Sequence, residues 1–156
     1  MGSIYHSPQA ATATWQAMRQ FVDQGGVGLF GRPAGEMKCA GAPLKYTFIT
    51  DDHLRRRNQR GKAELIYMAL PSMEMSKLRV AERVAHGGHN IPTADIERRF
   101  ARSLGNLLNV FSAEVDACRC FMNSSAVPEL VFEQQGDVRN IVHAQHHEHL
   151  LKEAAP

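Results

Sequence analysis

The chain has 156 residues, 44% of them hydrophobic and 22% charged, which suits one globular domain with a normal core. Its 18 basic and 16 acidic side chains give a net charge of +2, so we expect no general nucleic-acid partner. No apolar run approaches the roughly 20 residues that cross a bilayer, and the amino terminus lacks a secretory pattern. The three cysteines favour reduced thiols, and we therefore expect a cytoplasmic protein without a membrane partner.

Residues 1–60 form an atypical segment in which little regular structure is predicted. A helix is expected over 11–24, where apolar residues recur at helical spacing, and the glycines of 25–35 break any regular element after it. Residues 46–50 are β-branched and aromatic, which predicts a short strand. The Asp51-Asp52 pair is then expected to cap a short basic helix.

From Gly61 onward the pattern is typical of an α/β protein. The apolar run 65–70 predicts a buried parallel strand covered by helices on both faces. A helix is expected over 74–85, and Gly87-Gly88 is expected to end it. Three apolar residues of this helix are predicted to enter the core: Met75, Leu78 and Val84.

A second helix is predicted to start at Pro92-Thr93, with Thr93 as its N-cap. Its apolar stripe has three- and four-residue steps and consists of Ile96, Phe100, Leu104, Leu107, Leu108 and Phe111. Strands are expected at 118–122, with both cysteines on the core side, and at 130–133. A hairpin turn at Gly136-Asp137 then leads into 138–142, and a final helix is expected over 143–152.

Basic residues are concentrated on both sides of the glycine turn. Because a guanidinium fork matches phosphate oxygens, arginines on two helices joined by a glycine hinge suit a nucleotide. His89 and Asn90 are expected to hydrogen-bond a phosphate, ribose or substrate. The competing interpretation is a solvated helix surface paired with Glu82, Asp95 and Glu97. The candidate arginines are Arg79, Arg83, Arg98, Arg99 and Arg102.

An ordered string of motifs over about residues 62–142 resembles the carboxy-terminal half of the zeta-toxin family of P-loop kinases. The similarity is closest to the broad bacterial branch described as predicted ATPases. Its later part includes Met122-Asn123-Ser124 and Pro128-Glu129-Leu130-Val131. Its earlier part consists of residues 65–72, 79–84, 87–92, 96–100 and 102–107.

The resemblance implies a P-loop-kinase-like α/β fold, with a partial parallel sheet and flanking helices, that uses ATP and Mg²⁺. Members of the family phosphorylate a small acceptor, a UDP-linked amino sugar in the best-known cases, and act as toxins neutralised by a protein antitoxin. Arg83, with Arg98 or Arg99, would be a lid arginine on the ATP phosphates. His89 and Asn90 would lie in the lid turn.

The sequence departs from this family at the phosphate-binding loop. Gly26 and Gly31 have the spacing of Gly-x-x-x-x-Gly-Lys-Ser/Thr, but Arg32-Pro33 follows them. Asp51 and Asp52 are better explained as helix caps than as the family's catalytic aspartate, so the catalytic residues stay unassigned. Met122 also stands where this branch usually has aspartate.

Two hypotheses follow for residues 61–152. The first is a zeta-toxin-like ATP-dependent kinase, truncated or degenerate, with ATP, a small-molecule acceptor and an antitoxin as partners. The second is a non-catalytic remnant that binds anions or a partner protein.

The final helix is rich in histidine. His143 and His147 are spaced i, i+4 and can chelate a transition metal, but no His-Glu-x-x-His pattern accompanies them. We therefore expect an exposed helix, with His146 and His149 also on it, and no metal site.

Overall fold

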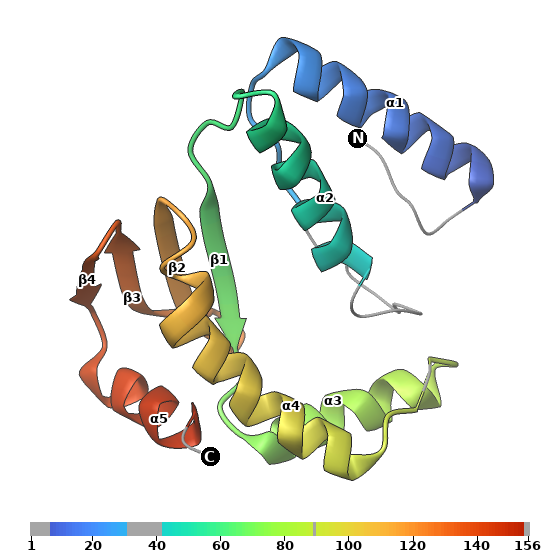
Figure 1. The fold of residues 1–156 in the computed structure, drawn as a ribbon. Coiled ribbons are helices and arrows are strands. Elements are labelled where there is room, and N and C mark those ends of the chain that lie inside the picture. Colours follow the sequence, from blue (N-terminus) through green and yellow to red (C-terminus); the bar gives the residue numbers. More distant parts are fainter. Residues whose placement is uncertain (1–6, 31–41, 89, 155–156) are drawn as a thin grey trace. The chain divides into compact units, whose positions relative to one another are not determined.

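The structure, a computed structural model, describes residues 7–30, 42–88 and 90–154. The chain divides into two compact units, Met1–Gly61 and Lys62–Pro156 (Figure 1). Within the described residues, no helix combines the length and the apolar character that crossing a membrane requires.

The first unit contains two helices, α1 (Pro8–Gln24) and α2 (Ala42–Arg56). The prediction of a helix over 11–24 is confirmed, and α1 begins three residues earlier because Ser7 accepts a hydrogen bond from the Ala10 N–H at 3.1 Å. Gly25 ends α1 with a φ of 73°, a conformation that favours glycine. Residues 26–30 have no regular structure, as expected.

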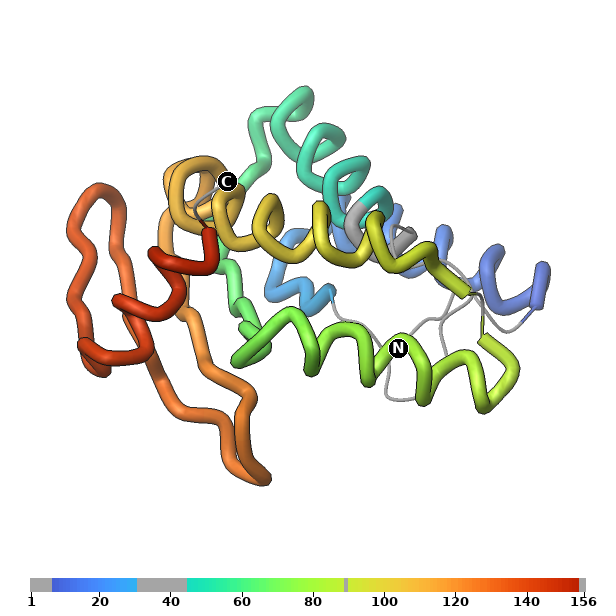
Figure 2. Tube along the Cα trace, turned by 90° about the horizontal axis from the view of Figure 1, so that it is seen from below, coloured from blue at the N-terminus to red at the C-terminus, as the bar shows by residue number. Residues whose placement is uncertain are grey.

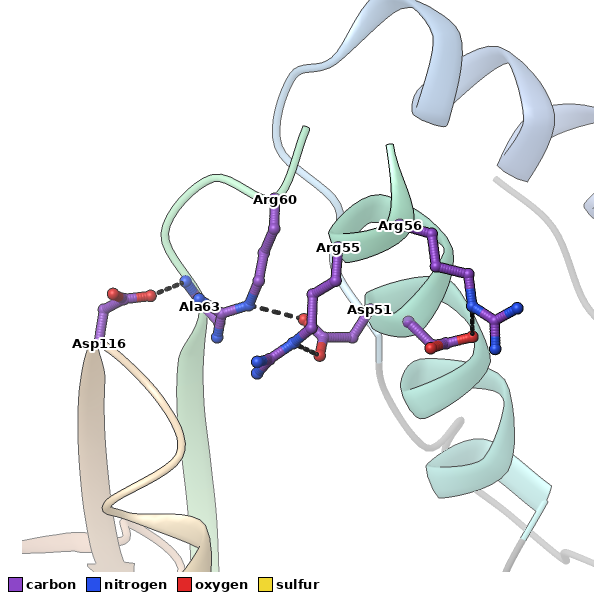
Figure 3. Close-up of polar contacts among 7 residues, drawn as sticks. Asp51, Arg55, Arg56, Arg60, Ala63 and Asp116 are labelled. Carbon is purple, nitrogen blue, oxygen red and sulfur yellow. Dashed lines mark hydrogen bonds and ion pairs between the residues drawn. The ribbon is translucent and has the colours of Figure 1, made fainter. Parts of the chain in front are cut away.

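The predicted strand at 46–50 is wrong, because these residues lie inside α2. Asp51 and Asp52 are also helical rather than capping. Their carboxylates bind Arg55 at 2.7 Å and Arg56 at 2.9 Å, one turn along (Figure 3). Such i, i+4 pairs stabilise a helix, and here they accompany a segment whose β-branched residues favour a strand only weakly.

Asp51 also joins α2 to the segment that follows it. Arg60 Nε donates to Asp51 Oδ1 at 2.8 Å, while Arg55 Nε donates to Oδ2 of the same carboxylate (Figure 3). Partial burial raises the pKa of Asp51, but the hydrogen bonds from Arg55 and Arg60 outweigh this effect and hold the pKa below its usual value. Asp51 is thus a structural anchor of the first unit.

The second unit is built on a four-stranded open mixed sheet with the order β1-β2-β3-β4. The strands β1 (Glu64–Ala69) and β2 (Ala117–Met122) are parallel. The antiparallel β3 (Glu129–Gln135) and β4 (Val138–Ile141) follow as a hairpin. The flanking helices are α3 (Met73–Ala85), α4 (Thr93–Asn106), a π-helical turn η1 (Leu107–Phe111) and α5 (Ala144–Ala154). The α/β class and the predicted element order of this unit are confirmed.

Strand β1 differs from its prediction in position and burial. It pairs with β2 in parallel, as expected, but it lies at the edge of the sheet. Leu65, Tyr67 and Ala69 pack toward the core. Ile66 and Met68 point to the other face and are 56% and 45% exposed. The apolar run therefore contacts helices on one face only.

The core lies between the sheet and the helices α4, η1 and α5, which cover one face (Figure 1). Most of the predicted apolar stripe is confirmed, since Ile96, Phe100 and Leu104 of α4 and Leu107 and Leu108 of η1 are buried. Phe111, at the end of η1, is only partly buried. The two cysteines of β2 face this side, as predicted. The residues whose side chains are most completely enclosed here are Phe132, Leu104, Leu107, Met122, Leu150, Val131, Cys118 and Cys120.

A buried polar network joins η1 to the β3–β4 hairpin. Arg139 Nε donates to Gln134 Oε1 at 2.8 Å, and its Nη2 donates to Leu108 O at 3.0 Å and to Ser112 Oγ at 2.9 Å. Gln134 Nε2 donates to the backbone oxygens of Ser112 and Gly136. These bonds satisfy carbonyl groups that the irregular end of the helix leaves without intrahelical partners.

Two predictions about α3 and α4 are corrected. Ser72 caps α3 through a hydrogen bond from the Met75 N–H, but no side chain of α3 is fully buried and Leu78 is 53% exposed. Helix α4 starts at Thr93 with Pro92 in the cap position and no side-chain cap bond, so Thr93 is not the N-cap. Pro92 instead supplies a φ of −53°, close to the helical value, and its carbonyl accepts from Asp95 and Ile96.

Candidate functional site

The candidate arginines lie on α3 and α4, which run side by side in opposite directions (Figure 2). Lys77 of α3 and Glu97 of α4 join the two helices by an ion pair of 2.7 Å. Arg79 on α3 and Arg102 on α4 are exposed. The pair leaves the sheet just after the carboxyl end of β1 and returns to it at β2, so it forms the crossover between two parallel strands.

Arg98 and Arg99 share one acidic partner. Arg98 Nη2 lies 2.9 Å from one carboxylate oxygen of Asp95, and Arg99 Nη2 lies 3.6 Å from the other. The hydrogen bond from Arg98, together with the charge of Arg99, lowers the pKa of Asp95. Both guanidinium groups are more than half exposed. The structure therefore brings these two predicted residues together, but on a solvated helix face.

The glycine turn closes the carboxyl end of α3. Gly87 has a φ of +89°, and the Gly88 N–H donates to Arg83 O at 2.9 Å, which confirms that the glycines end the helix. A Cβ added to Gly88 would lie 2.6 Å from Cγ of Arg83 and 2.8 Å from its carbonyl oxygen. Glycine is thus required by this close approach, and the stem of the half-buried Arg83 packs against the turn.

The two polar residues predicted beyond the turn have different outcomes. Asn90 is exposed, at the start of the connection to α4. His89 lies outside the described residues. The structure accordingly places the predicted arginines on one helix pair.

The histidines of α5 separate into different environments. The ring of His147 meets Phe132 edge-on with centroids 5.9 Å apart, and burial, together with the charge of Arg139, lowers the pKa of His147. His149 Nε2 instead bonds to Pro71 O, at the end of β1. His143 and His147, whose i, i+4 spacing could chelate a metal, therefore do not face a common site, because the ring of His147 packs against Phe132.

His143 has other neighbours. Its ring stacks on that of His146, with centroids 4.0 Å apart and planes inclined by 24°. Nε2 of His143 lies 3.8 Å, and Nε2 of His146 3.5 Å, from Oε2 of Glu129. Sequence reasoning missed Glu129, because only the hairpin between them brings it close to these histidines.

The described cysteines are shielded from solvent. Cys118 and Cys120 are 0% exposed, and their Sγ atoms are free thiols. Burial raises the pKa of both thiols, that of Cys120 to about 12. They are small core residues, as predicted, and poor nucleophiles. Cys39 lies outside the described residues.

Comparison with known proteins finds a partial similarity. Over 67 residues the chain is 36% identical to the mouse protein "Sulfide:quinone oxidoreductase, mitochondrial". This match spans 43% of the chain and only 14% of the mouse protein. No known family profile matches the chain, and no solved structure matches it.

Proposed function

We propose that the second unit, Lys62–Pro156, is the lid-bearing half of a zeta-toxin-like kinase that binds nucleotide phosphates through its arginines. The observation that carries the proposal is the crossover from β1 to β2, which holds every candidate arginine on α3 and α4. In open α/β sheets, ligands bind beyond the carboxyl ends of the parallel strands. The α3–α4 pair begins at that end, where a lid over a nucleotide would stand.

In this proposal, ATP–Mg²⁺ is the ligand and a nucleotide sugar is an example of the small-molecule acceptor, with an antitoxin as the protein partner. We expect the chain itself not to catalyse phosphoryl transfer, because its sequence lacks Gly-x-x-x-x-Gly-Lys-Ser/Thr. Without that backbone cradle, arginines can neutralise phosphate charge but cannot align a γ-phosphate for in-line attack. We therefore expect binding without turnover.

The alternative is a protein-interaction module. The exposed Ile66 and Met68 of the edge strand β1 favour it, since an uncovered apolar edge is suited to pairing with another chain. Only the nucleotide-binding function requires the arginines of α3 and α4, so replacing arginines distinguishes the two functions.

Replacing both Arg98 and Arg99 with alanine should weaken ATP–Mg²⁺ binding at least about tenfold, because each guanidinium can form charge-assisted bonds to phosphate. Both side chains are exposed, so the double variant should keep its fold. The measurement is titration calorimetry on the full chain, with ATP hydrolysis followed in parallel. No hydrolysis is expected from either protein.

Arg119→Ala is the matched control, since Arg119 is also an exposed, ion-paired arginine of the second unit. Its variant should bind ATP like the parent chain. If Arg119→Ala weakens ATP–Mg²⁺ binding as much as the double variant does, the loss reflects only the lower net positive charge and not a specific site. If the folded parent chain gives no binding heat with ATP–Mg²⁺, the nucleotide-binding proposal is contradicted, and the protein-interaction module becomes the favoured function.

A second candidate function comes from the partial match to the mouse oxidoreductase, whose name assigns it sulfide and a quinone as substrates. No described residue supports this function in the present chain. Thiol chemistry with sulfur requires a thiolate, and the described Cys118 and Cys120 are buried with raised thiol pKa values.

Cys118 and Cys120 should resist alkylation by iodoacetamide at pH 8 until the protein unfolds, because both thiols are buried and have raised pKa values. Peptide mass spectrometry with and without denaturant measures this difference. The raised thiol pKa of Cys120 also implies that the folded state loses stability as the pH rises from about 9 towards about 12, because the unfolded thiol ionises first. Rapid labelling of either thiol in the native protein would contradict their burial.

A further inference from the structure

The geometry points to a zinc-type metal site formed by Glu129, His143 and His146. One ligand atom from each residue lies within 4.8 Å of the others. The residues come from the first position of β3 and from the start of α5, so they converge from two elements of the second unit. The site is independent of the arginines on α3 and α4.

The distances within this cluster suit the ligands of a metal ion better than direct hydrogen bonds. Glu129 Oε2 lies 3.8 Å from Nε2 of His143 and 3.5 Å from Nε2 of His146. Both distances exceed the range of about 2.7–3.2 Å that N–H···O hydrogen bonds prefer. Ligand atoms around tetrahedral zinc, with Zn–N bonds of about 2.0–2.1 Å, are separated by about 3.3 Å. Coordination of one ion therefore requires a contraction of the cluster and a rotation of the two stacked rings, because stacked rings direct their nitrogen lone pairs in nearly parallel directions.

The backbone holds the two halves of the cluster in place. The N–H groups of Val142 and His143 both donate to Val131 O, at 2.9 and 3.0 Å. Val131 is two residues from Glu129 on β3, so the carboxylate and the start of α5 have a fixed separation. The backbone positions of the three residues are thus fixed before an ion binds, which favours a metal centre.

The chemistry of the three side chains also suits zinc. Two imidazoles and one carboxylate are the ligand set of many three-residue zinc sites, in which water takes the remaining position. The side chains of His143, His146 and Glu129 are 35%, 26% and 49% exposed, so an ion and its water can enter.

Metal binding has one local cost. Nδ1 of His143 accepts a 3.3 Å hydrogen bond from the His146 N–H, which places the proton of a neutral ring on Nε2. Coordination through Nε2 moves that proton to Nδ1 and breaks this long bond. Because zinc binding and the cap bond compete, we expect the first turn of α5 to change when the metal binds.

The test is titration of the full chain with Zn²⁺, and with Co²⁺ as a spectroscopic probe of coordination. The parent chain should bind one ion at this site and unfold at a higher temperature in its presence. Zinc binding should weaken about 10- to 100-fold or more in each of the variants Glu129→Gln, His146→Ala and His143→Asn. Removing a residue that only hydrogen-bonds to a metal ligand already costs that much affinity, so removing a ligand itself should cost at least as much. Asn at 143 preserves a side-chain acceptor for the α5 cap.

His86→Asn is the matched control, because His86 is an exposed histidine at the end of α3. It should bind Zn²⁺ like the parent chain, and circular dichroism should show every variant folded. Unchanged affinity in the folded Glu129→Gln and His146→Ala variants would overturn the proposal. So would equal loss in the His86 variant, or a parent chain that binds no zinc.

Discussion

Phe132→Ala should lower the free energy of unfolding of the second unit by about 3–5 kcal/mol, the range for truncating a buried aromatic ring. The ring is 0% exposed, the guanidinium carbon of Arg139 lies 4.6 Å from its centroid, and His147 meets it edge-on. Truncation leaves a cavity and removes both contacts. Urea unfolding followed by circular dichroism measures the change.

Val138→Ala in the same hairpin is the control. Val138 is 74% exposed, so its truncation leaves no cavity, and the midpoint of unfolding should hardly move. If the two variants unfold at the same urea concentration, Phe132 does not occupy the core that the structure assigns to it.

Arg139→Ala is expected to have the second largest effect, a loss of about 2–4 kcal/mol. Removing this side chain takes away the hydrogen bonds that it donates to Gln134 Oε1, Leu108 O and Ser112 Oγ, and leaves Leu108 O with only the 3.3 Å bond from the Ser112 hydroxyl. Buried polar groups without partners cost about 1–3 kcal/mol each, and water entering the cavity recovers part of this cost. Thermal and urea unfolding of the variant measure the loss.

A comparison with Arg119→Ala separates burial from charge. Arg119 has one exposed ion pair, with Glu64, so its removal should change stability far less than the removal of Arg139. Equal effects of the two variants would mean that the network around Arg139 contributes no more than a surface ion pair.

The sequence determined those elements whose signals are local and strong. The apolar stripe of α4 repeats at three- and four-residue steps, and Leu104 and Leu107 are accordingly buried. Gly136-Asp137 supplies the tight turn between β3 and β4, where Gly136 has a φ of +53°. Both patterns depend on a few neighbouring residues, so no distant contact was needed to interpret them.

The failed predictions concern elements that distant contacts decide. The β-branched and aromatic segment 46–50 is helical, with Thr50 buried and with the Tyr46 hydroxyl donating to Thr14 O of α1 at 3.4 Å. The apolar strand β1 lies at the sheet edge with Ile66 exposed, because hydropathy reports how apolar a strand is and not how many neighbours it has. Leu78 of α3 is likewise exposed, because its apolar character does not report how many neighbours α3 has.

For the candidate sites, the amino-acid order by itself located the arginines and the glycine turn, since both are contiguous features. Only the tertiary structure showed that Asp95 binds Arg98 and Arg99, and that Arg83 packs beneath Gly88. It also selected His146 rather than His147 as the neighbour of His143. That choice depends on which face of α5 packs on Phe132. The spacing of residues along the sequence does not show which face of a helix will contact the core.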